Sequence, residues 1–499
     1  MPASRPLAHF FSRLTTPRLA ALVTLVFALW AVVGTSWFMR HYFGLVTPDQ
    51  VLFHLQHGGL GEADSRLYAR AARCLAGVLG LTALSLFLLG RLRRVHRLPL
   101  LGALGVGAVL SVHATVADPC RPEADGGDYL ARHYVDPGNV GWQAPAVRPD
   151  VLVVFVESLD EAYTHPRAGR APLLPQLTRL QDDAQTLGRL HNLSGASWTL
   201  GGLFSALCGV PLQPVGVISR HAYDYAAHFY AGGHCLTDVL AGQGWQVSFY
   251  GGASLKFAGK GRFLQEHGVT RRFGAEQWRA AGVPVPARGW GLLDGGLAEQ
   301  AWADMQRPRA PGEARASLLL TVDTHGPAGA RDPACDAGSV RPADEDEDDV
   351  PVELMRGSLR CTDRVVASLV QRFVAQRDGR PKVVWIMGDH LSPAPLLDAD
   401  LQPAAGGRTV FHALARYDAD GRRLPGDDQR REFTHVDVLP TLAEAIGLRW
   451  APQHRLGLGV SLLAEDRSPT LIEREGLAHV DGRLSCRSPL FQRLWLNET

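Results

Sequence analysis

The sequence predicts an α/β fold in which a parallel sheet has helices on both faces. Three short apolar runs indicate the sheet: Val151–Val156, Leu318–Val322 and Val383–Met387. Runs of this length, rich in Val, Leu and Ile, are typical of parallel strands buried on both faces. Stretches with a helical pattern alternate with these runs, and that alternation favours helical layers above and below the sheet.

Five further stretches give the expected order of elements after residue 150. A strand is predicted at Val247–Tyr250, and helices are predicted at Leu173–Ala184, Leu200–Cys208, Glu353–Ala375 and Thr434–Ile446. The last of these carries apolar residues at helical spacing, which indicates an amphipathic helix near the end of the core.

Membrane-spanning helices are expected before this domain. Leu19–Met39, Ala71–Gly90 and Leu98–Ala117 are apolar, and about 20 residues at 1.5 Å per residue cross a hydrocarbon layer of about 30 Å. Ser111, His113 and Thr115 make the third stretch the least apolar at its end. A cleaved signal peptide is the alternative for the first stretch, but no small-residue cleavage site follows it.

Arginines set the expected orientation. They precede the first span and fill the short loop between the second and the third, so both clusters should stay in the cytoplasm. We therefore expect a membrane region at 1–117 that crosses the bilayer three times, a Pro- and Gly-rich linker at 118–149 and a domain at 150–499 that lies outside the cytoplasm. The formal net charge of the 499-residue chain is only +1, so no basic excess indicates a nucleic-acid partner.

Cysteine usage agrees with this topology. Cys74 lies in the second span, and the other six cysteines follow residue 117, where an oxidising compartment favours disulfides. We expect Cys208 to pair with Cys235 and Cys335 with Cys361, because each pair closes a loop of modest length. Free buried thiols are the alternative, and the absence of CxxC spacing argues against a zinc cluster.

Polar side chains follow each of the three apolar runs. Glu157-Ser158 follows the first, Asp323-Thr324-His325 the second and Gly388-Asp389-His390 the third. Ligands bind beyond the carboxyl ends of parallel strands. Two carboxylates and an imidazole at that edge suit a divalent cation such as Zn²⁺ or Mn²⁺. A structural Asp-His hydrogen bond and a helix-capping Glu157 are the alternatives.

A nucleophile is expected at a helix start, where unpaired N–H groups and the helix dipole favour a phosphoryl group. The stretch from Asn192 to Thr199 has small polar residues and precedes a helical run. Thr199 or Ser197 can serve, and the residues alone do not separate them. Ser197 as an N-cap beside an ordinary Thr199 is the alternative without chemistry.

Five motifs carry a resemblance to a known family: VLVVFVESLD (151–160), SWTLGGLFSALCGVPL (197–212), FYGGASLKFAGKGRFLQEHG (249–268), TVDTHGP (321–327) and WIMGDHL (385–391). In this order they resemble the lipoteichoic acid synthase and phosphoglycerol transferase branch of the alkaline phosphatase–sulfatase superfamily. The resemblance covers about residues 150 to 448. It implies an alkaline-phosphatase-like, mixed but mostly parallel sheet. Membrane helices before the domain fit the layout of the family, so the resemblance also implies a multi-pass protein of the bacterial inner membrane with a periplasmic catalytic domain at 150–499.

The resemblance also implies roles for individual residues. Glu157, Thr199, Asp389 and His390 would hold one divalent cation, with Mn²⁺ expected ahead of Mg²⁺ and Zn²⁺, and Thr199 would also be the nucleophile. His325 would bind the phosphoglycerol head or act on the leaving or attacking oxygen, and Lys260 would contact the phosphate. Asp294 of the WGLLD motif stays a possible site residue, and His435 and Asp437 are expected to dock the following helix.

The implied reaction moves glycerol phosphate from phosphatidylglycerol to a periplasmic glucan or related glycan through a phosphoglycerol-threonine intermediate. A phosphoethanolamine transferase and a phosphodiesterase of the same superfamily are the enzymatic alternatives, and a non-catalytic membrane sensor or scaffold is the third. A sulfatase needs a C/S-x-P-x-R motif, and Cys208-Gly-Val-Pro-Leu lacks its Arg.

Overall fold

The computed structural model describes residues 16–43, 65–91, 94–116, 127–165, 172–213, 228–287, 289–326, 329–335, 350–392, 397, 407–426, 429–451, 454–486 and 488–496. Contacts divide the chain into two compact units, Met1–Asp118 and Pro119–Thr499.

The first unit consists, in its described residues, of helices α2 (Thr16–Phe43), α4 (Ser65–Arg91) and α5 (Arg94–Val116). Helix α2 packs against both α4 and α5. Pro17–Phe38 and Ala71–Arg91 are long and apolar enough to cross a membrane. The third expected span, Leu98–Ala117, falls on helix α5, whose described side chains include the apolar stretch Leu98–Ser111; the side chains after Ser111 lie outside the described residues.

The second unit is built on a six-stranded sheet in the order β4-β3-β5-β1-β6-β7. Five strands are parallel, and β7 at one edge runs antiparallel to β6. The mixed, mostly parallel sheet expected from the sequence is therefore confirmed. The strands are β1 (Asp150–Val156), β3 (Trp245–Gly251), β4 (Arg271–Phe273), β5 (Ala314–Leu320), β6 (Lys382–Gly388) and β7 (His412–Tyr417).

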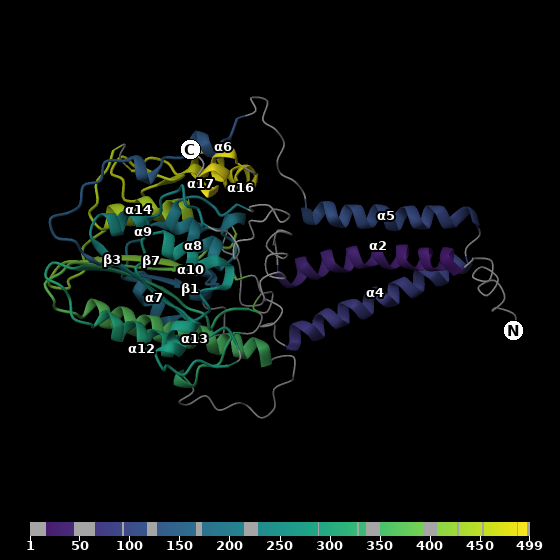
Figure 1. The fold of residues 1–499 in the computed structure, drawn as a ribbon, viewed down its shortest axis with the longest axis horizontal. Coiled ribbons are helices and arrows are strands. Elements are labelled where there is room, and N and C mark those ends of the chain that lie inside the picture. The colour runs from purple at the N-terminus through teal and green to yellow at the C-terminus, as the bar shows by residue number, and fades with distance from the viewer. Residues whose placement is uncertain are drawn as a thin grey trace. The chain divides into compact units, whose positions relative to one another are not determined.

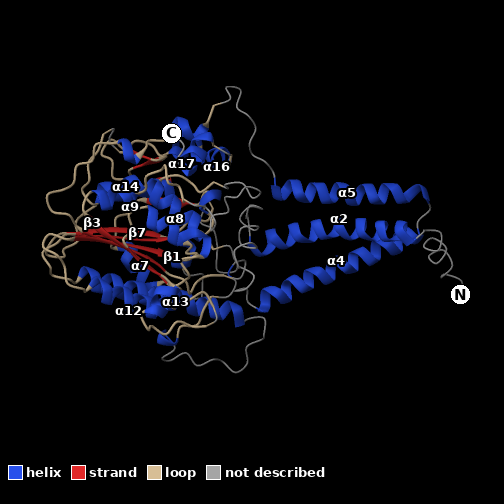
Figure 2. Ribbon diagram, viewed as in Figure 1, coloured by secondary structure: helices blue, strands red, loops and turns tan. Residues whose placement is uncertain are grey.

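Helices cover both faces of this sheet (Figure 1). One layer holds α7 (Pro175–Asp182), α12 (Asp294–Met305) and α13 (Val350–Val374); the other holds α8 (Thr199–Cys208), α9 (Leu236–Gly242), α10 (Lys260–Glu266) and α14 (Val438–Ala445). Every residue of β1, β5 and β6 is buried, as expected for central strands. Figure 2 shows the strands enclosed between these two layers.

Smaller elements complete the unit. They are α6 (Tyr129–His133), α11 (Ala275–Ala280), α15 (Leu471–Glu475), α16 (Leu477–Leu484), α17 (Pro489–Leu496) and the paired short strands β2 (Gly188–His191) with β8 (Arg431–Thr434) and β9 (Arg455–Leu456) with β10 (Gly459–Val460).

Two stretches differ from the sequence-based expectation. Residues 127–149, expected to be a linker, pack on this unit: Val135 bridges to Gly457 and Gln143 to Arg449. A composition rich in Pro and Gly fits an irregular segment that packs against a domain as well as it fits a free linker. The strand expected at Leu318–Val322 spans Ala314–Leu320 instead. Arg315 and Ser317 are polar but buried, so the strand begins earlier than the continuous apolar run indicates.

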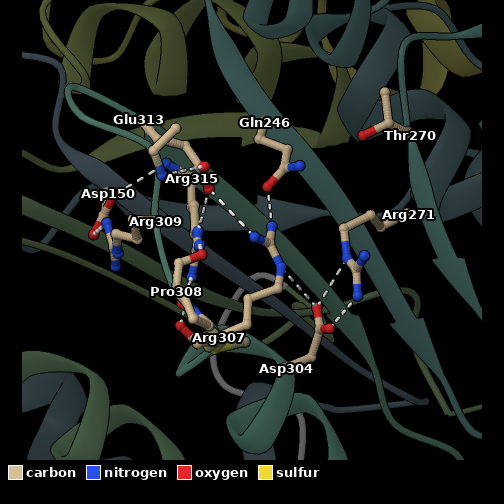
Figure 3. A network of polar contacts seen from close by, with 12 residues as sticks. Asp150, Gln246, Thr270, Arg271, Asp304, Arg307, Pro308, Arg309, Glu313 and Arg315 are labelled. Carbon is tan, nitrogen blue, oxygen red and sulfur yellow. Dashed lines mark hydrogen bonds and ion pairs between the residues drawn. The ribbon is translucent and has the colours of Figure 1, made fainter.

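A polar network fixes the sheet at the amino ends of its parallel strands (Figure 3). The buried guanidinium of Arg315 donates to the carbonyl oxygens of Met305, Arg307 and Pro308 at 2.8 to 3.0 Å. Asp150 accepts from Arg309 at 2.6 Å and from the backbone N–H of Arg315 at 3.0 Å. These partners satisfy one another and stabilise this end, which leaves the opposite, carboxyl ends of the strands for chemistry.

Candidate metal and phosphoryl-transfer site

The carboxyl ends of β1 and β6 bring the predicted ligands together. The two strands are parallel neighbours with Val156 opposite Gly388, so Glu157 and Asp389 leave the sheet side by side. Ligand atoms of Glu157, Asp389 and His390 all lie within 4.8 Å of one another, and all three side chains are buried. A sharp turn after Gly388 lets adjacent Asp and His residues face one point; a Cβ at Gly388 would meet the carbonyl oxygen of Leu159 at 2.5 Å.

The two oxygens of Asp389 have different surroundings. Oδ1 accepts the backbone N–H groups of Ser158 and of His390, both at 2.8 Å. Oδ2 is buried and has no hydrogen-bond partner among the described residues. Leaving a buried carboxylate oxygen unpaired costs free energy, so Oδ2 is suited to a bound cation.

The imidazole of His390 is oriented for the same point. Its Nδ1–H donates to the carbonyl oxygen of Leu391 at 2.8 Å. Its Nε2 therefore faces the carboxylates, at 3.3 Å from Glu157 Oε1 and 3.6 Å from Asp389 Oδ2. A hydrogen bond from the second ring nitrogen is what usually orients a metal-binding histidine.

Charge at the cluster also favours a cation. Burial raises the pKa of Glu157, but His325 and His390 outweigh it and hold that pKa well below its usual range. Burial and the nearby Glu157 raise the pKa of Asp389. Burial lowers the pKa of His390, but Asp389 and Glu157 outweigh it and raise the pKa to about 9. Two buried carboxylates thus attract positive charge, and with the imidazole they fit a divalent transition-metal ion.

Thr199 joins this cluster. It is the first residue of α8, and its Oγ1–H donates to Glu157 Oε2 at 3.0 Å. Ser197 is not the N-cap residue, because Trp198 occupies that position, and the Ser197 hydroxyl donates to the carbonyl oxygen of Ser194 at 2.7 Å. The geometry therefore favours Thr199 over Ser197. The first-turn N–H groups of α8 are oriented to favour an anionic group.

Glycines let α8 approach the ligands closely. A Cβ at Gly202 would lie 1.8 Å from the backbone carbonyl oxygen of Asp389, and one at Gly201 would lie 2.5 Å from that of Gly195. No larger residue fits without moving the helix. The GGL motif of the sequence thus positions the Thr199 hydroxyl against Glu157.

His325 lies on the loop that leaves β5. Its Nδ1–H donates to the carbonyl oxygen of Gly326 at 2.7 Å, which leaves Nε2 for a substrate. The ring packs against the indole of Trp290 with their centroids 4.0 Å apart. Its charge lowers the pKa of Glu157, so it faces the same site.

Asp294 braces this loop and is not one of the clustered ligands. Its Oδ1 accepts the N–H of Val322 at 2.7 Å and its Oδ2 accepts the Thr362 hydroxyl at 2.8 Å. In return, Asp323 accepts the N–H of Asp294 at 3.0 Å. The exit of β5 and the start of α12 are therefore tied together.

Lys260 begins α10 and is buried beside the cluster. Burial lowers its pKa to about 8, against the opposing effect of Glu157, Glu276 and Asp389. The preceding Ala258 and Gly259 have φ of 59° and 68°, a tight turn that carries the lysine to the site.

His435 and Asp437 fix the segment that follows β8. His435 Nε2–H donates to the carbonyl oxygen of Gly388 at 3.2 Å. Asp437 accepts the N–H of Thr434 and of Val460, both at 2.9 Å. These contacts agree with the docking role expected for both residues.

The structure joins Cys208 to Cys235 and Cys335 to Cys361, the pairs expected from the sequence. Cys208 is the last residue of α8, a full helix length from Thr199. Cys208, the cysteine of the incomplete C/S-x-P-x-R motif, is therefore part of a disulfide and lies at the far end of α8 from Thr199.

The sequence-based reasoning missed the contribution of Ser158. Its hydroxyl donates to Glu157 Oε1 at 2.7 Å, and its backbone has φ of 54°. The one signal in the sequence is its place directly after Glu157, at the end of an apolar run.

Comparison with known proteins decides the family. The model of the family described as Sulfatase matches residues 149–448. The chain belongs to the sulfatase family. This sulfatase-family chain is 29% identical over 468 residues to phosphoglycerol transferase I of Xanthomonas euvesicatoria pv. vesicatoria (strain 85-10), with 91% of the chain and 63% of the relative covered. It is 27% identical over 385 residues to phosphoglycerol transferase I of Escherichia coli O139:H28, with 75% and 48% covered. The chain thus spans about half to two thirds of these relatives.

Solved structures also resemble the chain at low identity. The lipoteichoic acid synthase LtaP of Listeria monocytogenes is 14% identical, with a TM-score of 0.48 and coverage of 65% of this chain and 79% of that chain. The phosphoglycerol transferase GacH of Streptococcus pyogenes, in complex with sn-glycerol-1-phosphate, is 13% identical, with a TM-score of 0.46 and coverage of 74% and 91%.

Proposed function

We propose that the chain is a membrane-anchored phosphoglycerol transferase that moves glycerol phosphate from phosphatidylglycerol to a periplasmic glucan or related glycan. The observation that carries the proposal is the hydrogen bond from Thr199 to Glu157, inside a buried cluster of two carboxylates and an imidazole. Membership of the sulfatase family and the names of the relatives support this reaction class.

Glu157, Asp389, His390 and Thr199 would hold one divalent cation, with Mn²⁺ expected ahead of Mg²⁺ and Zn²⁺. When bound, the ion supplies positive charge that makes the threonine hydroxyl easier to deprotonate and neutralises phosphate oxygens. The unpaired Oδ2 of Asp389 and the orientation of His390 support this ligand set.

In the first step, Thr199 Oγ1 forms a bond to phosphorus and the bond from phosphorus to the diacylglycerol oxygen breaks. In net terms, one proton moves from the Thr199 hydroxyl to the diacylglycerol oxygen. His325 Nε2 is the ring nitrogen left to carry that proton, because Nδ1 is bonded to Gly326. Lys260 balances the charge of the phosphate.

In the second step, a sugar hydroxyl of the acceptor forms a bond to phosphorus and the bond to Thr199 Oγ1 breaks. The sugar hydroxyl loses its proton and the threonine oxygen regains one, so the chain returns to its starting state. The positions of Thr199, His325 and Lys260 supply orientation, which is a large part of catalysis in phosphoryl transfer.

A membrane anchor suits a lipid donor. Helices α2 and α4 are long and apolar enough to span a bilayer, and α5 would be a third span. The arginine distribution then places the catalytic unit on the periplasmic side of the inner membrane. The head group of phosphatidylglycerol lies at that surface.

The test traps the covalent adduct. Full-length protein in bilayer nanodiscs is incubated with Mn²⁺ and phosphatidylglycerol or phosphatidylethanolamine, quenched in acid and digested, and the peptide with Thr199 is weighed. We expect the mass of glycerol phosphate on Thr199 with phosphatidylglycerol alone, its absence from Thr199→Ala and its presence in the matched control Ser197→Ala.

Other results overturn the proposal in different ways. An ethanolamine phosphate adduct identifies a phosphoethanolamine transferase. Release of free glycerol phosphate with no transfer to added glucan identifies a phosphodiesterase. A Thr199→Ala variant that still transfers glycerol phosphate moves the nucleophile elsewhere.

A further inference from the structure

Ser158 has a backbone conformation that serine rarely adopts. It follows Glu157 at the end of β1 and has φ of 54°, in the left-handed region that favours glycine. Conformations of this kind persist where the surrounding contacts require them, and they cluster at functional sites. A glycine would adopt the turn without strain, so the serine side chain must contribute something that glycine lacks.

Ser158 makes two hydrogen bonds at the cluster, and the one from its hydroxyl is the contribution that glycine lacks. The backbone N–H of Ser158 donates to Asp389 Oδ1 at 2.8 Å, and its hydroxyl donates to Glu157 Oε1 at 2.7 Å. The left-handed turn is what lets one residue reach carboxylates from two neighbouring strands. Ser158 is itself only 3% exposed, so water does not compete for these bonds.

The two bonds distinguish the oxygens of each carboxylate. Asp389 Oδ1 is occupied by Ser158 and by the N–H of His390, which leaves the unpaired Oδ2. On Glu157, Oε1 accepts from the Ser158 hydroxyl and lies 3.3 Å from His390 Nε2, whereas Oε2 accepts from Thr199.

We propose that Ser158 is a positioning residue that makes Glu157 and Asp389 each present one oxygen to the cation. The inference rests on the metal site of the proposed function and deepens it. Binding through one oxygen per carboxylate keeps coordination positions open for the Thr199 hydroxyl and a phosphate oxygen, as a catalytic site requires. Partners that orient metal ligands typically contribute ten- to a hundredfold to affinity.

The test measures Mn²⁺ binding directly, without substrate. Full-length wild-type protein, Ser158→Ala and Ser158→Gly are titrated with Mn²⁺, and free Mn²⁺ is followed by electron paramagnetic resonance. Both variants remove the hydroxyl; the glycine variant also relieves the positive φ. Ser205→Ala is the matched control, since Ser205 is fully buried and its hydroxyl donates to the carbonyl oxygen of Gly201 at 2.6 Å, away from the ligands.

We expect the dissociation constant for Mn²⁺ to rise at least about tenfold in both Ser158 variants and to stay unchanged in Ser205→Ala. Transferase activity of the Ser158 variants should recover at Mn²⁺ concentrations raised by the same factor, which a general folding defect would not allow. Thermal unfolding of the metal-free proteins identifies a misfolded variant, and Ser158→Gly gives the measurement if Ser158→Ala does not fold.

A folded Ser158 variant that binds Mn²⁺ as tightly as wild type overturns the proposal, as does a wild-type chain that binds no Mn²⁺. The measurement is separate from the choice of lipid and acceptor. Suppose that the dissociation constants for Mn²⁺ of the wild type and its variants differ as expected, but the wild type transfers no glycerol phosphate. That result contradicts the proposed function and still supports the role of Ser158.

Discussion

Lys260 shows how burial and charge compete at a single side chain. An ammonium group that is 3% exposed is costly to desolvate, and its pKa falls to about 8 although Glu157 and Asp389 favour the charged form. A chain that keeps such a residue beside two carboxylates retains a positive charge for a further anion. In the proposed reaction that anion is the phosphate of the donor.

The pKa of Lys260 gives a pH dependence with a definite sign. Lysine binds phosphate only when protonated, so KM for the donor should rise as pH increases through 8, by about tenfold between pH 7 and pH 9. Lys260→Arg should remove this rise, because arginine stays protonated. Initial-rate kinetics at fixed Mn²⁺ measure it.

The matched control is Lys256→Arg, at an exposed lysine one turn earlier, which should keep the pH profile of the wild type. A flat KM in the wild type, or the same rise in Lys260→Arg, would show that another group titrates and would remove Lys260 from the phosphate contact.

Helix α8 places the nucleophile through its backbone. Its first residue donates to Glu157, and its fourth, Gly202, lies against the carbonyl oxygen of Asp389. The helix is almost wholly buried and its last residue is tied to Cys235, the N-cap residue of α9. Thr199 and Asp389, the proposed nucleophile and ligand, are therefore held by one close contact between α8 and the exit of β6.

Gly202→Ala should remove activity by moving this helix. The added methyl would lie 1.8 Å from the Asp389 carbonyl oxygen, a backbone atom, so α8 must shift and carry Thr199 away from Glu157. We expect overpacking to lower the free energy of unfolding by about 1–3 kcal/mol and the rate of transfer by at least about a hundredfold. Thermal unfolding and initial rates measure both.

Gly242→Ala is the control, since a Cβ at Gly242 in α9 meets nothing within 4 Å. The same substitution there should be neutral or slightly stabilising, because alanine is the better helix former. Wild-type activity in Gly202→Ala would show that the close approach of α8 is not needed for catalysis.

The catalytic unit has opposite requirements at the two ends of its sheet. At the amino ends of the strands, Arg315, Arg309 and Asp150 satisfy one another and the nearby carbonyl groups. At the carboxyl ends, Asp389 Oδ2 has no hydrogen-bond partner in the described part of the chain, and the charges of Glu157 and Asp389 oppose each other. Interactions at the amino ends of the strands therefore stabilise the fold, whereas those at the carboxyl ends, where the site lies, are in part unfavourable.

Mn²⁺ should stabilise this unit. An ion that binds only the folded chain adds about 2.7 kcal/mol to the free energy of unfolding at a hundred times its dissociation constant. We expect the midpoint of thermal unfolding to rise with Mn²⁺ and to return on adding a chelator. Asp389→Asn should lose the response, because the neutral amide removes the negative charge that would hold the cation.

Asp420→Asn is the control for that measurement. Asp420 lies in an exposed turn and pairs with Arg422, so its variant should respond to Mn²⁺ as the wild type does. An equal response in Asp389→Asn would place the stabilising ion at another site.

Much of the fold follows from local pattern alone. The buried runs at Val151–Val156 and Val383–Met387 are β1 and β6 almost to the residue, because only central parallel strands are apolar on both faces. The antiparallel edge strand β7 and the short β4 were missed, since edge strands lack that pattern. The helix expected at Thr434–Ile446 begins with a 3-10 turn that holds His435 against Gly388.

The sequence by itself determined which side chains leave the ends of β1, β5 and β6, since an apolar run and the polar residues after it are adjacent in the chain. Only the tertiary structure brought the Thr199 hydroxyl, and not that of Ser197, into a hydrogen bond with Glu157, and showed the hydrogen bonds of Ser158 on which its proposed role rests. Those depend on the register that sets Val156 opposite Gly388, and on a helix close enough for a hydroxyl to reach across 3.0 Å to Glu157. Contacts between residues remote in the chain arise from packing, and no local pattern encodes them.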